Sequence, residues 1–391
     1  MPVRLMAGLL YLKQAYNLSD DDVCVRWLEN PYWQFFTGEV FFQTRLPCDP
    51  SSLTRWRQRL GEAGMEELLA QTLAAARSMK AVDARELSRV IVDTTVQEKA
   101  IAYPTDSRLL EVARKQWVRL AKRHNIPLRQ SDEREGPRLR RRAGGYAHAK
   151  QFKRLKRVLR RQRTLLGRVI RDLQRKLESA NATAQEALTL WIGRAQRLHA
   201  QKPKDKNKLY ALHAPEVECI SKGKARQPYE FGVKVGVAVT ATRGLIVGAR
   251  SFPNNPYDGD TLAEQLEQVE ILSGQRPATA LVDLGYRGRE VDGVVIVHRG
   301  KAKSLTKAQR RWLRRRQAVE PVIGHLKADH RMDRCRLKGA LGDAMHAIAC
   351  CAAGYNLRWL MRWIAAFCVW CMSALADLLF GDRRRTALSS G

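Results

Sequence analysis

Three carboxylates stand where an ionised acid is unexpected. Asp93 ends the apolar run RVIVD, and Asp283 ends a second one, TALVD. Glu320 stands behind a run of arginines and directly in front of Pro321. Each acid also has an ordinary explanation, because a strand-end Asp can cap a turn and Glu320 can form an intrahelical ion pair with Arg316. A shared role requires that the fold bring all three together.

Three carboxylates without a histidine cluster are typical of a site for Mg²⁺ or Mn²⁺, because hard cations prefer oxygen ligands. Two such ions about 3.5–4 Å apart can activate a nucleophilic oxygen and stabilise the leaving oxygen of an in-line phosphoryl displacement. Ligands of open α/β sheets bind beyond the carboxyl ends of strands. Asp93 and Asp283 can therefore share a site, and a helix packed on the same sheet would bring Glu320 to them.

The elements that must position these acids follow from the hydrophobic pattern. Helical periodicity in the first part of the chain changes to a β-branched strand at Asp93, returns in a long basic segment, and gives way to further strands. A strand, a hairpin and then alternating helices and strands predict an α/β fold with a mixed sheet flanked by helices. We expect a helical N-terminal domain for DNA binding or dimerisation (1–86), a catalytic domain (87–106 and 209–362), a basic helical insertion (107–208), and an apolar helix with a basic tail (363–391).

The charge of the chain points to a polyanionic partner. The 391 residues carry a formal net charge of +31, and 45% of them are hydrophobic, which suffices for a sizeable core and excludes a disordered basic tail. Lys and Arg that neutralise phosphates gain affinity by releasing counterions, so nucleic acid is the first expectation. An anionic membrane is the competing one.

The first residues, the cysteines and one apolar stretch bear on the cellular compartment of the protein. The first residues, MPVRLMAGLLYLKQAYNLSDDD, lack a small-residue cleavage site, so we expect the protein in the cytoplasm. The Cys350-Cys351 pair and the CVWC at residues 368–371 predict buried free thiols rather than zinc ligands or disulfides. The apolar stretch at residues 363–380 predicts a core or oligomerisation helix, with a membrane span as the alternative.

Several other polar residues are candidates for DNA contact, and each has a structural alternative. A basic face or turn can simply be solvated, and Tyr286 can pack in a loop as readily as contact a base. His298 and His325 are expected to be structural, and Asp258 and Asp260 to mark a helix N-terminus, with metal binding as a minor alternative. The candidates for DNA contact are Arg55, Arg57, Arg59, Lys222, Lys224, Arg226 and Arg287.

Longer motifs give the chain a resemblance. The segments are NPYWQFFTGEVFFQ, LPCDPSSLTRWRQRLGEAG, VDTTVQEKAIAYPTD, HAPEVECISKGKARQPYEFGVKVGVA, VDLGYRG and EPVIGHLKADHRMDR. Together they resemble the DDE-type transposases of bacterial insertion sequences, specifically the family named after insertion sequence five, over most of the chain. The resemblance implies a ribonuclease-H-like catalytic domain with Asp93, Asp283 and Glu320 as its acids. It also implies Mg²⁺-dependent cutting at terminal inverted repeats and joining of the 3′ ends to target DNA.

The wider group carries a signature of Tyr, two residues, Arg, three residues, Glu, six residues and Lys. Arg316, Glu320 and Lys327 occupy three of these positions, while Leu313 stands at the Tyr position. The change to Leu313 removes any contact that is specific to the Tyr side chain, and it leaves the expected metal site unchanged. Arg316 and Lys327 would then contact DNA phosphates beside Glu320. Pro321 lacks a backbone donor and biases Glu320 away from α geometry, so we expect a kink or a helix start there.

The sequence therefore leads to the hypothesis of a cytoplasmic, nucleoid-associated transposase with two Mg²⁺ ions, for which Mn²⁺ can substitute. Its partners would be double-stranded DNA, as element ends and as target, and further copies of the chain, because bridging two ends needs at least a dimer. No membrane partner is expected. Two alternatives stay open: a stand-alone metal-dependent DNA nuclease, and a non-catalytic DNA-binding repressor or domesticated relative.

Overall fold

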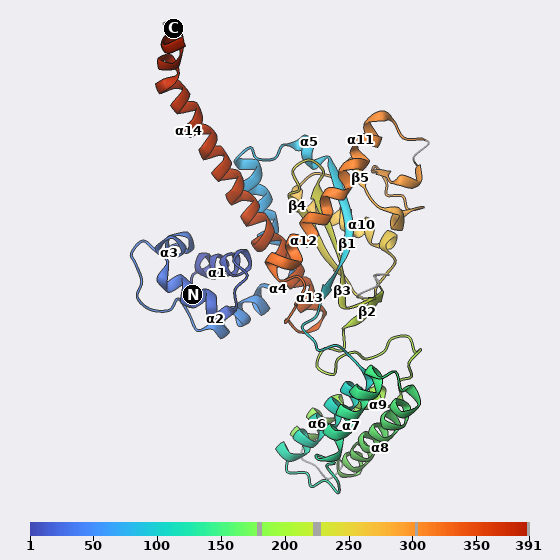
Figure 1. Ribbon diagram of the computed structural model, residues 1–391. Coiled ribbons are helices and arrows are strands. Elements are labelled where there is room, and N and C mark those ends of the chain that lie inside the picture. The colour runs from blue at the N-terminus through green and yellow to red at the C-terminus, as the bar shows by residue number, and fades with distance from the viewer. Residues whose placement is uncertain (178–181, 222–227, 302–303, 389–391) are drawn as a thin grey trace. The chain divides into compact units, whose positions relative to one another are not determined.

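The computed structural model describes residues 1–177, 182–221, 228–301 and 304–388. The chain forms two compact units, one made of residues 1–99 with 233–391 and the other of residues 100–232. Figure 1 shows a mixed sheet with helices around it in the first unit and a bundle of helices in the second.

The N-terminal helices of the first unit start at clear capping signals. Ser19 and Asp22 form a reciprocal capping box, Asn30 caps a helix that begins with a proline, and Asp49 does the same for the next one. Inside this region Trp27 is buried and donates its Nε1 hydrogen to Thr37 Oγ1 at 2.7 Å. The helices are α1 (Val3–Ala15), α2 (Asp20–Glu29), α3 (Pro31–Thr37), α4 (Pro50–Ser78) and α5 (Ala84–Leu87).

Six strands form one sheet in the order β2-β3-β1-β5-β6, with β4 also paired to β3. β5 lies parallel to both β1 and β6, whereas β3 lies antiparallel to β2 and β4. The predicted mixed sheet and its hairpin are therefore confirmed. The strands are β1 (Arg89–Glu98), β2 (Glu218–Ser221), β3 (Tyr229–Thr240), β4 (Ile246–Phe252), β5 (Thr279–Leu281) and β6 (Val295–Val297).

Helices cover both faces of the sheet. Successive strand residues point to opposite faces, so Ile91 packs in a cluster with Val319 of α12, while Val90 and Val92 join a second cluster. This is the predicted α/β arrangement, a ribonuclease-H-like mixed sheet flanked by helices. The helical elements after β4 are a 3₁₀ turn (Asp258–Thr261), α10 (Leu262–Ser273), a 3₁₀ turn (Leu284–Tyr286), a 3₁₀ turn (Arg299–Lys301), α11 (Lys307–Arg315), a 3₁₀ turn (Arg316–Ala318), α12 (Val319–His330), α13 (Gly339–Ala349), a π-helical segment (Cys350–Asn356) and α14 (Leu357–Leu388).

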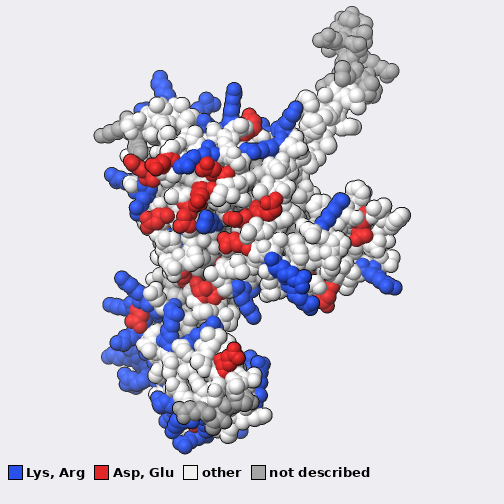
Figure 2. Space-filling model, turned by 180° about the vertical axis from the view of Figure 1, so that it is seen from behind, with Lys and Arg blue, Asp and Glu red and all other residues white. Residues whose placement is uncertain are grey.

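The second unit is a basic helical bundle followed by β2. On α8, Leu166, Ile170 and Leu173 are buried against Leu188 and Ile192 of α9. Lys and Arg far outnumber Asp and Glu in residues 100–232, and they cover much of the visible surface of this unit (Figure 2). The helices are α6 (Asp106–Arg123), α7 (Glu135–His148), α8 (Phe152–Leu177) and α9 (Ala182–Ala200).

The C-terminal helix corrects two expectations. Cys350 and Cys351 are buried free thiols as predicted, but Cys368 and Cys371 are exposed. Residues 363–376 of α14 are not a core helix, because Phe367, Trp370 and neighbouring apolar side chains lie at the surface and no other described element packs over them. By length and composition, the stretch Gly339–Ala376 is apolar enough to cross a membrane, and a single such helix is weak evidence for a span.

One buried amide joins three elements of the first unit. Asn356 is fully buried in the π-helical segment. Its Oδ1 accepts from Ile246 N at 3.1 Å, and its Nδ2 donates to Ile246 O at 2.8 Å and to Thr72 Oγ1 at 3.0 Å. Asn356 therefore provides hydrogen-bond partners for the backbone of Ile246 in β4 and for the hydroxyl of Thr72 in α4.

We expect Asn356→Leu to lower the free energy of unfolding by about 2–4 kcal/mol, because buried backbone groups of Ile246 lose their partners. Chemical denaturation measures the change. Met361→Leu, at a half-exposed position five residues later, is the control and should change the free energy by less than about 0.5 kcal/mol. Equal stability of the two variants would show that the amide does not join these elements.

Candidate active site

The register of β1 and β5 brings the two aspartates together. Ile91 pairs with Leu281 in this parallel ladder, so Asp93 and Asp283 follow two residues later on the same face. Each uses one oxygen locally: Asp93 Oδ1 accepts from Thr94 N at 2.9 Å, and Asp283 Oδ1 accepts from Gly285 N at 2.8 Å. The second oxygen of each is the one nearest to a common cation.

That cation is the guanidinium of Arg316. Its Nη2 lies 2.9 Å from Asp93 Oδ2 and 3.9 Å from Asp283 Oδ2, and its Nη1 lies 3.9 Å from Glu320 Oε1. The three acids predicted from the sequence thus surround one positive group. The side chains become progressively more exposed, from 16% for Asp93 through 36% for Asp283 to 63% for Glu320. The site is therefore open to solvent on the side of Glu320.

Local helix geometry sets the positions of Arg316 and Glu320. A 3₁₀ turn (Arg316–Ala318) joins α11 to α12, and Glu320 lies in the first turn of α12 with Pro321 after it. The predicted helix start is confirmed, but the expected bias of Glu320 away from α geometry is wrong. Pro321 is tolerated because backbone N–H groups in the first helical turn have no intrahelical partner. The i, i+4 relation of Arg316 and Glu320 exists, yet Arg316 is closer to Asp93.

Asp93 differs from its prediction in one respect. It lies in the middle of β1, which continues to Glu98, and not at or near the end of the strand. What ends there is the pairing with β5, because the chain after Leu281 leaves the ladder for the turn at Leu284–Tyr286. Asp93 therefore still lies where the neighbouring strand turns away.

A fourth acid, Asp258, lies beside Asp283. Asp258 Oδ1 pairs with Lys234 Nζ at 2.7 Å and accepts from Thr94 Oγ1 at 2.9 Å. Asp258 and Asp260 lie in the 3₁₀ turn that leads into α10, so they mark a helix N-terminus as predicted, although neither side chain caps it. The available signal was Lys234 itself, because a lysine inside the apolar strand YEFGVKVGVAVT needs a buried partner.

Gly285 and the buried Tyr286 lie close to the acids of the site. A Cβ on Gly285 would lie 2.9 Å from Asp283 Oδ1 and 3.2 Å from Asp258 Oδ2, which explains the absence of a side chain there. Tyr286 is fully buried. Burial raises the pKa of its phenol well above the ordinary value, and the nearby charge of Asp93 adds to the effect. Tyr286 therefore packs in the core, which decides between its two predicted roles.

The residues fit divalent metal by chemistry, although Arg316 keeps them from forming a ready-made site. Asp93, Asp283, Glu320 and Asp258 offer only carboxylate oxygens, the ligands that Mg²⁺ and Mn²⁺ prefer. Among the ion pairs of the described residues, these four acids pair with two cations, Arg316 and Lys234, so negative charge is in excess there. Within the described residues no three acidic, histidine or cysteine groups are already placed to hold a metal ion.

The candidate DNA contacts lie in different surroundings. Arg287 is exposed four residues after Asp283, and Lys327 is half-buried on α12, two turns after Glu320 and thus on the same side of the helix. Arg55 and Arg59 are exposed on α4, whereas Arg57 is buried and holds Asp20 with both Nη groups. The basic turn of Lys222, Lys224 and Arg226 lies outside the described residues.

The two histidines have structural surroundings. His298 is buried, and its Nδ1 accepts from Gly300 N at 3.1 Å. His325 pairs with Asp329 one turn later on α12, at 2.7 Å. Both histidines therefore have local partners, as expected of structural residues.

Comparisons with known proteins agree with this geometry. A transposase domain model (DUF772) matches residues 1–59, and a transposase DDE domain model matches residues 195–357. The chain is 54% identical over 149 residues to an uncharacterized protein, ORF8 in the nfe locus of Rhizobium meliloti, covering 38% of this chain and 72% of the relative. No solved structure matches significantly. The chain belongs to the DDE-type insertion-sequence transposases, a family of DNA transposition.

The arrangement around Arg316 predicts competition between its guanidinium and a divalent ion. We expect Arg316→Met to lower the free energy of unfolding by on the order of 1–2 kcal/mol without metal, since the acids lose their cation. We also expect Mn²⁺ to raise the unfolding temperature of Arg316→Met more than that of the wild type. Arg314→Met, at an exposed neighbouring position, is the matched control. An equal Mn²⁺ response in all three proteins would contradict this account.

Proposed function

We propose that the protein is a transposase that binds the terminal inverted repeats of its own insertion sequence and catalyses metal-dependent DNA cleavage and strand transfer. The observation that carries the proposal is the convergence of Asp93, Asp283 and Glu320 on one guanidinium. These acids come from three distant parts of the chain, and ordinary capping or a single ion pair does not require them to meet. The match to a DDE domain supports the same assignment.

In this proposal Asp93, Asp283 and Glu320 hold divalent metal, with two Mg²⁺ ions expected and Mn²⁺ as a substitute. When bound, the metal would help to activate the attacking oxygen and to stabilise the leaving oxygen of the phosphoryl displacement. Arg316 keeps the acids together before DNA arrives and can then offer its guanidinium to a phosphate oxygen. Lys327 would hold a neighbouring phosphate on the same side of α12.

The reaction has two displacements. A water oxygen attacks phosphorus at the end of the element, and the bond from phosphorus to O3′ breaks and leaves a 3′-hydroxyl. That hydroxyl then attacks a phosphodiester of the target DNA, whose own O3′ leaves. No covalent bond to the protein is needed, and Glu320, as the most exposed acid of the site, lies nearest to the side from which DNA would approach.

Basic surfaces away from the acids would hold the DNA. We assign phosphate contacts to Arg287, Arg55 and Arg59, and to the turn containing Lys222, Lys224 and Arg226. The helices of residues 1–86 and the basic bundle within residues 100–232 offer further contact area. Joining two ends in one reaction requires at least a dimer at synapsis. We place this activity in the bacterial cytoplasm, on nucleoid DNA.

The test is cleavage and joining of DNA that carries the native gene's flanking ends, with Mg²⁺ and with EDTA. We expect Asp93→Asn, Asp283→Ala and Glu320→Gln each to reduce joining at least about 100-fold, because each removes a carboxylate from the same site. Glu267→Gln, at an exposed Glu on α10, is the matched control and should keep full activity.

The outcomes separate the alternatives. Cleavage without joining would favour a stand-alone nuclease. Tight binding of the ends by all variants, with no chemistry in any of them, would favour a DNA-binding repressor. Wild-type joining by the Asp283→Ala and Glu320→Gln variants would show that the acids were assigned wrongly.

A further inference from the structure

A second charged site lies in the same unit, between the N-terminal helices and the segment after α12. Two cavities of about 280 and 450 Å³ adjoin there and share several lining residues. We call this site the basic pocket and define it by its cationic side chains, which are Lys13, Arg57, Arg331, Arg334, Arg336 and Lys338. None of them belongs to the acidic site around Arg316.

The basic pocket holds more positive charge than its own acids neutralise. Among the described residues that line the two cavities, six cationic side chains face three carboxylates, Asp20, Asp21 and Asp333. Asp20 is already shared, with Lys13 Nζ at 2.6 Å and Arg57 Nη2 at 2.6 Å. An anion would relieve the repulsion that remains.

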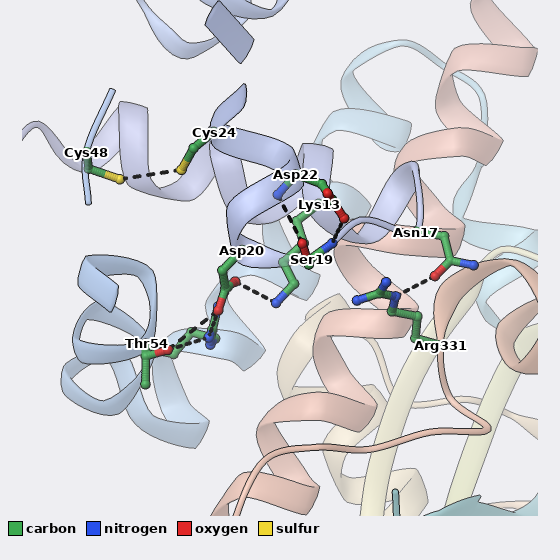
Figure 3. A network of polar contacts seen from close by, with 10 residues as sticks. Lys13, Asn17, Ser19, Asp20, Asp22, Cys24, Cys48, Thr54 and Arg331 are labelled. Atoms are coloured by element: carbon green, nitrogen blue, oxygen red, sulfur yellow. Dashed lines mark hydrogen bonds and ion pairs between the residues drawn. The ribbon is translucent and has the colours of Figure 1, made fainter. Parts of the chain in front are cut away.

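Burial and neighbouring positive charge lower the pKa of two pocket residues. Burial lowers the pKa of Lys13, and the neighbouring Arg57 lowers it further. Burial likewise lowers the pKa of Arg331, followed by the effect of Arg336. Figure 3 shows Lys13 directed to Asp20 and Arg331 directed to Asn17, which its Nε contacts at 2.5 Å.

The buried guanidinium of Arg57 leaves one of its donors without an acceptor among the described residues. Arg57 is only 5% exposed, and its Nη1 and Nη2 both donate to Asp20, at 2.8 and 2.6 Å. Its Nε has no hydrogen-bond partner among the described residues, although Arg57 lines both cavities. A buried guanidinium N–H without an acceptor is costly, and Arg57 adds its positive charge to the lining of both cavities.

We propose that the basic pocket binds a backbone phosphate of the DNA on which the acidic site acts. The proposal rests on the proposed function for its choice of DNA as the anion. α12 connects the two sites, because Glu320 lies in its first turn and Arg331 is its C-cap. Eleven residues of helix span about 16 Å, which a DNA strand covers in roughly five nucleotides. The pocket would thus hold the strand at a set distance from the phosphate that reacts.

The experiment measures binding of the full chain to a fluorescent DNA duplex by anisotropy, without divalent metal and over a series of salt concentrations. Arg336→Gln removes one exposed pocket charge. We expect weaker binding and a slope of log affinity against log salt that falls by about 1, the value for one lost phosphate contact. Arg77→Gln, at an exposed Arg that lines neither cavity, is the matched control and should retain the wild-type slope.

A variant of opposite sign keeps the test independent of folding defects. Asp333→Asn removes an exposed acid from the pocket and should tighten DNA binding. Wild-type affinity and slope in both Arg336→Gln and Asp333→Asn would overturn the proposal. So would an effect of Arg336→Gln no larger than that of Arg77→Gln, because it would reflect net charge alone.

A further arm separates DNA from a free anion. If inorganic phosphate raised the unfolding temperature of the wild type but not of Arg336→Gln, while DNA binding was the same for both, the pocket would be a site for free phosphate and the proposal would fail. Glu320→Gln should lose DNA joining, whereas Arg336→Gln should lose DNA affinity measured without metal. A failure of the acidic site in catalysis is therefore distinguishable from a failure of the basic pocket in binding.

Discussion

Two carboxylates on one face of a sheet and a third on the helix beside it repel each other, and they stay together in this protein because one guanidinium lies among them. Arg316 reaches Asp93 at hydrogen-bond distance and lies within 4 Å of Asp283 and Glu320. A planar, permanently charged group with several donors suits this position better than an ammonium. The arrangement requires β1, β5 and the start of α12 to be held in fixed relation.

The core supplies that relation. The parallel register of β1 with β5 puts Asp93 and Asp283 side by side, and strand alternation points them to the face that α12 covers. Val319 and Val322 of α12 pack in the same cluster as Ile91 and so anchor the helix directly beside Glu320. Apolar packing thus places the acids, and Arg316 offsets the electrostatic cost of their closeness.

The same helix separates two kinds of charge. Its first turn contributes to an acidic site with an excess of carboxylates, and its C-terminal end borders a pocket with an excess of cations. A polyanion is attracted by the second and repelled by the first unless further positive charge arrives there. Divalent metal is the kind of charge that carboxylates attract most strongly. The two ends of α12 therefore suit a phosphate backbone and its metal ions together.

Local patterns in the sequence were sufficient for much of this account. The strand at residues 229–240 and the hairpin after it follow from period-two alternation and a short turn, and both are present. Short sequence motifs were enough to select the candidate site residues, which are Asp93, Asp283, Arg316 and Glu320. Those patterns depend on neighbours within a few residues, which the sequence displays directly.

Tertiary structure decided what depends on distant partners. Asp258 lies at a helix N-terminus as expected, but its pairing with Lys234 was not foreseen. Arg57 is buried on Asp20 rather than exposed with Arg55 and Arg59. The helix after residue 357 is as apolar as a core helix, yet its side chains at 363–376 are largely exposed. Composition reports how much apolar or charged surface a segment carries. Only the packing of the whole chain decides what covers that surface, because an ion pair or a buried face is completed by residues far away in sequence.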